Sequence, residues 1–128
     1  MKVWEECSLA TQIERWENCI RVLQSLTPHQ RRKHWDMADF GYKTECGTIA
    51  CAAGHCGMDP WFRRRGLRLT PGTPETIHVG YSVDVETFFG SAGSYKIFFD
   101  TEPRSVGTVI KECKRYVRSL KNLDQEAA

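Results

Sequence analysis

The regular spacing of apolar residues near the end of the chain most constrains how it can fold. Over residues 105–120, apolar side chains recur every three or four positions, which is the pattern of an amphipathic helix. One face of this helix holds Val106, Val109, Ile110, Cys113, Tyr116, Val117 and Leu120, and the other holds Lys111, Lys114, Arg115, Arg118 and Lys121. Because an isolated helix of this length is marginally stable in water, the pattern predicts a core of packed helices.

Three more helices are predicted from periodicity and from capping residues. Apolar residues at spacings of four and three indicate a helix over about residues 8–25, with the stripe Leu9, Ile13, Trp16, Ile20 and Leu23. Thr27-Pro28 and Asp59-Pro60 each place a capping side chain before a proline, which is favoured at the first helical position. Short helices are therefore expected after both, and the second should end at Gly66.

The fold class expected from these patterns is α+β. After Gly66 the period changes from helical to alternating, so residues 67–70 and 76–81 are predicted to form two short strands joined by a turn. Short helices are expected at 83–89 and 94–99. We expect a single small domain over residues 1–121, mostly helical, with a two-stranded antiparallel hairpin at about 67–81 and a disordered polar tail over 122–128.

The cysteine-rich segment is predicted to be a buried helix over residues 47–57. Five residues in or just after this segment fall at helical spacing, and most of them are small, which would let a neighbouring helix approach closely. They are Gly47, Ala50, Cys51, Gly54 and Met58. The facing surface could come from Trp16 or Tyr116. Three of the six cysteines lie at or within this segment, and ideal helical geometry separates neighbouring ones too far for a disulfide.

Composition limits the classes of partner. The formal net charge is only +2, whereas a dedicated nucleic-acid binder usually has a much larger basic excess. No stretch approaches the roughly 18 apolar residues of a membrane span. The N-terminus lacks the apolar run of a signal peptide, so we expect a cytoplasmic protein with reduced thiols and no membrane partner.

Cys46 is the best candidate for a catalytic nucleophile. A thiol at the start of a helix is close to free N–H groups and to the positive end of the helix dipole, which favour the thiolate. Catalysis would also need a histidine within hydrogen-bond reach. His55 would lie too far along the same helix, so the candidate partners are His78 and His34. The alternative is a packed structural thiol.

Metal binding has a weaker basis. Cys51 and His55 are four residues apart, so both could reach one zinc ion from a single helix face. No second pair with ligand spacing completes the site, and no cofactor is expected.

Two short basic clusters are the candidate binding residues. They are Arg31, Arg32 and Lys33, and Trp61 with Arg63, Arg64 and Arg65. Both combine cations with aromatic neighbours, which suits an acidic protein surface or phosphate, although a solvated helix face has the same composition.

The motif Cys46-Gly47-Thr48-x-x-Cys51-x-x-Gly54-His55, followed by Phe88-Phe89-Gly90, resembles a group of small uncharacterised bacterial and phage proteins. These proteins share C-G-T-x-x-C-x-x-G-[HW] and a later F-F-G, and the resemblance covers about residues 35–99. It implies a microbial or phage origin but no activity. In this chain residues 90–94 interrupt the short helix that follows F-F-G in the group.

The predicted function is a non-enzymatic protein-interaction module, in which a phage-encoded protein modulates a host factor. A thiol-dependent enzyme with Cys46 as nucleophile is the main alternative. A zinc-binding or nucleic-acid-associated small protein is another.

Overall fold

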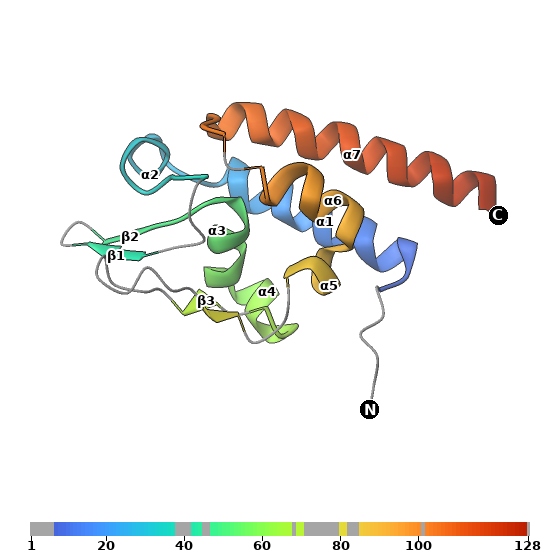
Figure 1. Cartoon of the computed structure of the whole chain (residues 1–128), viewed down its shortest axis with the longest axis horizontal. Coiled ribbons are helices and arrows are strands. Elements are labelled where there is room, and N and C mark those ends of the chain that lie inside the picture. Colours follow the sequence, from blue (N-terminus) through green and yellow to red (C-terminus); the bar gives the residue numbers. More distant parts are fainter. Residues whose placement is uncertain are drawn as a thin grey trace.

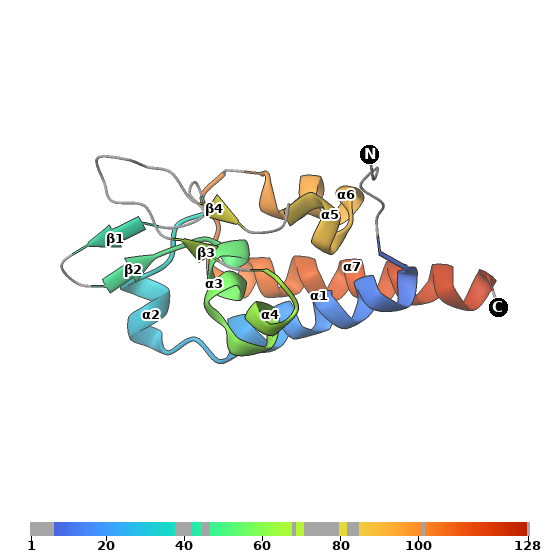
Figure 2. The same cartoon turned by 90° about the horizontal axis from the view of Figure 1, so that it is seen from below.

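Two long helices, α1 (Leu9–Gln24) and α7 (Val106–Ala127), form the central pair of the fold. The structure is a computed structural model and describes residues 7–37, 42–44, 47–67, 69–70, 80–81, 85–100 and 102–127. The two helices lie side by side and run in opposite directions (Figures 1 and 2). The short helices pack against this pair, so the apolar face predicted for residues 105–120 is covered as expected.

The predicted cap of the second helix is confirmed. The Thr27 hydroxyl accepts from the Gln30 N–H at 3.1 Å, and the Gln30 side chain accepts from the Thr27 N–H at 2.8 Å, which starts α2 (Pro28–Lys33). Helix α1 is capped by Ser8, whose hydroxyl accepts from the Thr11 N–H.

Helix α4 (Pro60–Arg64) begins and ends where the sequence predicts. Asp59 accepts from the Trp61 N–H, and Gly66 adopts a φ of 99° just beyond the helix end. The N–H groups of Gly66 and Leu67 donate to the carbonyls of Arg63 and Phe62, which is the Schellman pattern. Leu67 is thus the apolar residue that closes a helix, and it is fully buried in the core.

The α+β fold class with a hairpin at 67–81 is wrong. Helices make up 76% of the residues whose backbone and side chains are both described, and no strand or sheet lies among them. Only two backbone residue pairs join β3 (Leu69–Thr70) to β4 (Gly80–Tyr81), and 71–79 lie outside the described residues. The alternation that begins at Leu67 is misleading because this residue completes α4.

The predicted helix over residues 47–57 begins later than expected. Helix α3 (Ala52–Met58) starts after Cys51, whereas β2 (Gly47–Ile49) pairs antiparallel with β1 (Tyr42–Thr44). The β-branched residues Thr48 and Ile49 favour this extended backbone. The expected burial is confirmed, because every residue from Ala52 to Gly57 is buried at the centre of the fold.

Helix α7 continues beyond its predicted end. It reaches Ala127, so the prediction of a disordered tail from residue 122 is wrong. The tail is polar, but Lys121, Gln125 and Glu126 are good helix formers, and polarity does not prevent a helix from continuing into solvent. In both views the C-terminal end of α7 extends past the start of α1 (Figures 1 and 2).

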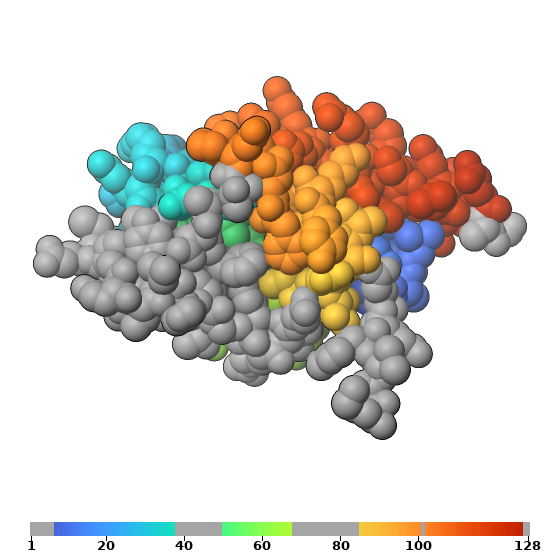
Figure 3. Space-filling view, in the orientation of Figure 1, coloured from blue at the N-terminus to red at the C-terminus, as the bar shows by residue number. Residues whose placement is uncertain are grey.

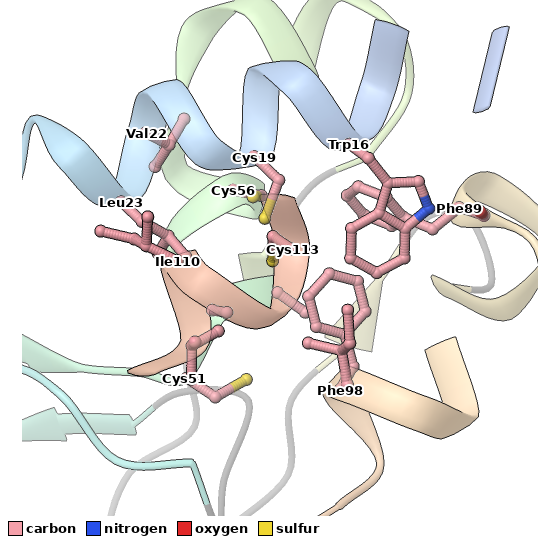
Figure 4. Close-up of a cluster of buried hydrophobic side chains, with 14 of the residues drawn as sticks. Trp16, Cys19, Val22, Leu23, Cys51, Cys56, Phe89, Phe98, Ile110 and Cys113 are labelled. Atoms are coloured by element: carbon pink, nitrogen blue, oxygen red, sulfur yellow. Dashed lines mark hydrogen bonds between the residues drawn. The ribbon is translucent and has the colours of Figure 1, made fainter. Parts of the chain in front are cut away.

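Trp16 lies at the centre of the core and contacts several elements (Figure 4). Its indole N–H donates to the Phe89 carbonyl at 2.9 Å, which anchors α5 (Val85–Phe89) on α1. Its ring stacks on Phe98 of η1 (Ser94–Phe98), a π-helix that follows α6 (Ser91–Gly93). The edge-on contact with Tyr116 brings in α7. Among the described helices, none is long and apolar enough to cross a membrane.

Gly93 should not tolerate a methyl group. A Cβ there would lie 2.5 Å from the Tyr116 ring and 2.6 Å from the Trp16 ring, both of which are held by further ring contacts. We expect Gly93→Ala to lower the free energy of unfolding by about 1–3 kcal/mol in urea denaturation. Gly107→Ala is the control, since its Cβ would meet only Ser105 Oγ at 3.9 Å. This variant should raise the free energy of unfolding by up to about 1 kcal/mol, because alanine favours a helix more than glycine does. Equal stability of the two variants would contradict the packing argument.

Candidate functional site

The exposed side of α7 carries a continuous row of cations, here called the α7 basic face. Its members are Lys111, Lys114, Arg115, Arg118 and Lys121, all of them exposed. The buried side of the same helix includes Val109, Cys113 and Leu120. The 3.6-residue period thus places the cations in a row on the side facing away from the core. In Figure 3, α7 forms one edge of the molecule, next to the segment that contains η1.

Most of the α7 basic face has no ion-pair partner within the described ranges. Lys121 is the exception, because its Nζ lies 2.9 Å from Glu17 Oε2 of α1. The other four cations form no such pair, although they lie three or four residues apart. Like charges at this spacing repel one another by roughly 0.2–0.5 kcal/mol per pair. The face therefore keeps a positive charge that slightly opposes helix stability.

Three hollows border the α7 basic face. One of about 290 Å³ lies between α1 and α7, and a second of about 260 Å³ lies among Lys111, Lys114, Arg115 and Arg118. A third of about 210 Å³ lies between η1 and α7, with Lys96 and Arg115 among its lining residues. Because Lys114 and Arg115 each line two of these hollows, the three form one connected surface.

Arg104 fixes the edge of this surface. Its side chain is only 10% exposed, and it pairs with Glu112 of α7. The same guanidinium donates to the carbonyls of Ile97 and Asp100 at the end of η1. The charge of Glu112 is therefore paired with Arg104, although its half-buried side chain lines the same hollow as Arg115.

The two predicted basic clusters are partly used within the fold. Arg31 donates to the carbonyls that end α1, and Arg63 donates to the Gly57 carbonyl. Arg65 lies over the half-buried Trp61 ring, 3.7 Å from its centre. These three side chains cap helices or cover an aromatic ring. Arg32, Lys33 and Arg64 remain exposed, on two separate short helices.

The thiols of Cys19, Cys56 and Cys113 meet inside the core (Figure 4). Burial raises the pKa of Cys56. For Cys113, a hydrogen bond with Cys19 raises the pKa first, and burial adds to it. In Cys19 a hydrogen bond with Cys113 lowers the pKa, but the bond with Cys56 and burial outweigh it. All three are therefore held as neutral thiols, which are poor nucleophiles.

The candidate catalytic residues are not brought together by the described part of the chain. Cys46 and His78 lie outside the described residues. Because β2 rather than a helix follows Cys46, the helix-terminus argument for its reactivity no longer applies. His34, at the end of α2, helps to hold this helix against α3. Its carbonyl accepts from the Ala50 N–H and lies 2.7 Å from His55 Nε2.

The two candidate zinc ligands are buried and take part in packing within the fold. Cys51 is the fully buried N-cap of α3, and His55 is buried one turn later. Because a carbonyl can only accept, His55 Nε2 carries the proton that it donates to His34, and its ring stacks on Trp35. Within the described ranges, no group of three or more histidine, cysteine or acidic side chains could hold a metal ion.

Comparison of the chain with protein-family models, with curated proteins and with solved structures gives no match. The resemblance to small bacterial and phage proteins consequently stays a prediction from the motif.

The sequence pattern places the cations of the α7 basic face on the exposed side of the helix. What it did not reveal is that three hollows border this face and that Glu112 pairs with Arg104. The period identifies the exposed side of a helix, whereas contacts with Arg104 and with Glu17 of α1 decide which of its charges are already paired.

The three clustered thiols should be inert in the native protein. We expect Cys19, Cys56 and Cys113 to resist Ellman's reagent at pH of about 7, because each is buried and holds its proton. The measurement is peptide mapping after timed labelling, with guanidinium-unfolded protein as the control in which all six cysteines react. Labelling of any of the three at the unfolded rate would show that the cluster is open.

His55 should make stability depend on pH. Burial lowers its pKa, so the unfolded chain takes up a proton first as pH falls below the ordinary histidine value of about 6.5. The free energy of unfolding should be full above that pH and should decrease as pH falls towards the folded pKa. We expect urea titrations at several pH values to show a smaller decrease in His55→Phe. A parent-like slope in His55→Phe would contradict this prediction.

Proposed function

We propose that the protein is a non-enzymatic interaction module that binds an acidic surface of a partner protein through the α7 basic face. The observation that carries this proposal is the row of Lys111, Lys114, Arg115 and Arg118, four adjacent cations without an ion-pair partner within the described ranges. An acidic partner would relieve their mutual repulsion and would be attracted from a distance.

An acidic protein explains this face better than a nucleic acid does. Proteins that bind single-stranded nucleic acid usually combine cations with exposed aromatic rings on which bases can stack. The aromatic residue of α7 itself, Tyr116, is half-buried and contacts Trp16 edge-on. The net charge of +2 also falls short of the basic excess typical of nucleic-acid binders.

Binding without catalysis is supported by the state of three of the described thiols. Cys19, Cys56 and Cys113 are buried and protonated, so they serve packing. The motif resemblance extends the proposal to a phage protein that acts on a bacterial host factor. That extension stays a prediction from the sequence.

Charge reversal on α7 tests the proposal. We expect labelled poly-L-glutamate of about 20 residues to bind the parent protein and to dissociate as salt is raised, because screening weakens exposed charge pairs. The variant Lys111→Glu/Lys114→Glu/Arg118→Glu should lose binding by about tenfold or more in fluorescence anisotropy.

The matched control is Arg32→Glu/Lys33→Glu/Arg64→Glu, which changes the net charge equally at three exposed cations outside α7. It should bind within about twofold of the parent if position matters more than net charge. Equal loss in both variants would contradict a specific role for α7. Tighter binding of single-stranded DNA than of polyglutamate would assign the face to nucleic acid instead. Circular dichroism should confirm that both variants remain helical.

A further inference from the structure

The hollow between α1 and α7 has an apolar floor and charged ends. Val117, which is 6% exposed, and the half-buried Ile20 provide methyl groups from the two helices. Lys114 lies beside them, and Lys121 with Glu17 completes the lining. A volume of about 290 Å³ is enough for one aliphatic side chain of a partner.

The spacing of the two lysines suits a helical ligand. Lys114 and Lys121 are seven residues apart on α7, which corresponds to about 10.5 Å along the helix axis. Val117 lies between them, three residues after the first and four before the second. On a second helix, acidic residues three before and four after a central leucine are separated by the same rise.

We infer that the partner presents an acidic amphipathic helix with the pattern E-x-x-L-x-x-x-E to this hollow. This inference rests on the proposed function and names the chemistry of its partner. The leucine enters between Ile20 and Val117, and the flanking carboxylates pair with Lys114 and Lys121. The remaining cations of the α7 basic face then meet further acidic side chains on the same partner.

Lys121 can exchange its present partner at small cost. Its ion pair with Glu17 is exposed on both sides, at 53% and 47%, and such pairs contribute little to stability. An incoming carboxylate can therefore share or replace Glu17. A second copy of this chain is a poor occupant, because it would bring the same cations against the α7 basic face. A phosphate backbone would leave the apolar floor unfilled.

The experiment compares three synthetic peptides of about five helical turns on the full-length chain. The first carries E-x-x-L-x-x-x-E, the second replaces leucine by glutamine, and the third moves each glutamate one position towards the opposite face at unchanged composition. Helix content of the free peptides should be matched by circular dichroism. Affinities are measured by fluorescence anisotropy at a fixed salt concentration.

We expect the first peptide to bind at least about tenfold more tightly than the other two, since a buried leucine and paired charges each contribute at this scale. Ile20→Gln should remove most of the preference for leucine, and Lys114→Gln/Lys121→Gln most of the preference for glutamate position. Arg32→Gln/Lys33→Gln is the matched control and should keep both preferences. Folding of each variant is checked by its urea midpoint.

Equal affinity of the three peptides, or binding of polyglutamate without binding of the first peptide, would overturn this inference and leave the proposed function intact. If the parent protein bound neither polyglutamate nor the first peptide, the proposed function and this inference would both be overturned. Self-association of the protein in sedimentation that is abolished by Lys114→Gln/Lys121→Gln would assign the hollow to a second copy and would also overturn the inference.

Discussion

The packing of Trp16 is the interaction on which the rest of the structure depends. Its fully buried indole is held by a hydrogen bond to Phe89 and by ring contacts with Phe98 and Tyr116. One side chain of α1 thereby sets the positions of α5, η1 and α7. Its donor is satisfied, so the burial of a large aromatic ring carries no desolvation cost from an unpaired N–H.

Arg104 extends this order to the surface. Burying a guanidinium is costly unless its charge is paired, and here Glu112 supplies the charge while two carbonyls at the end of η1 supply hydrogen bonds. The Arg104 carbonyl in turn accepts from the indole N–H of Trp35 at 2.7 Å. The Trp35 ring stacks on His55. Core packing and the outer face of α7 are thus linked through one residue, because the main-chain carbonyl of Arg104 holds Trp35 while its guanidinium pairs with Glu112.

Buried thiols and exposed cations lie in separate parts of the molecule. Three of the described cysteines, Cys19, Cys56 and Cys113, are buried between α1, α3 and α7 and cannot react there. The α7 basic face, in contrast, has hollows and unpaired charge. A binding function assigned to it therefore leaves the thiols free to fill the narrow space in which three helices meet.

The sequence by itself determined the elements whose formation is local. Capping by Thr27 and Asp59, the glycine that ends α4 and the period of α1 and α7 act within a few residues, so they can be read directly. Only the tertiary structure decided that Leu67 closes a helix rather than opening a strand, because that depends on a buried site beside Phe62. It also decided that residues 47–49 pair with β1 before α3 begins, since a strand needs a partner that the local sequence does not name. The same holds for the candidate site: the period of α7 places its cations on one side, but the position of Glu17 on α1 decides that Lys121 is paired, because pairing depends on residues far away in the chain.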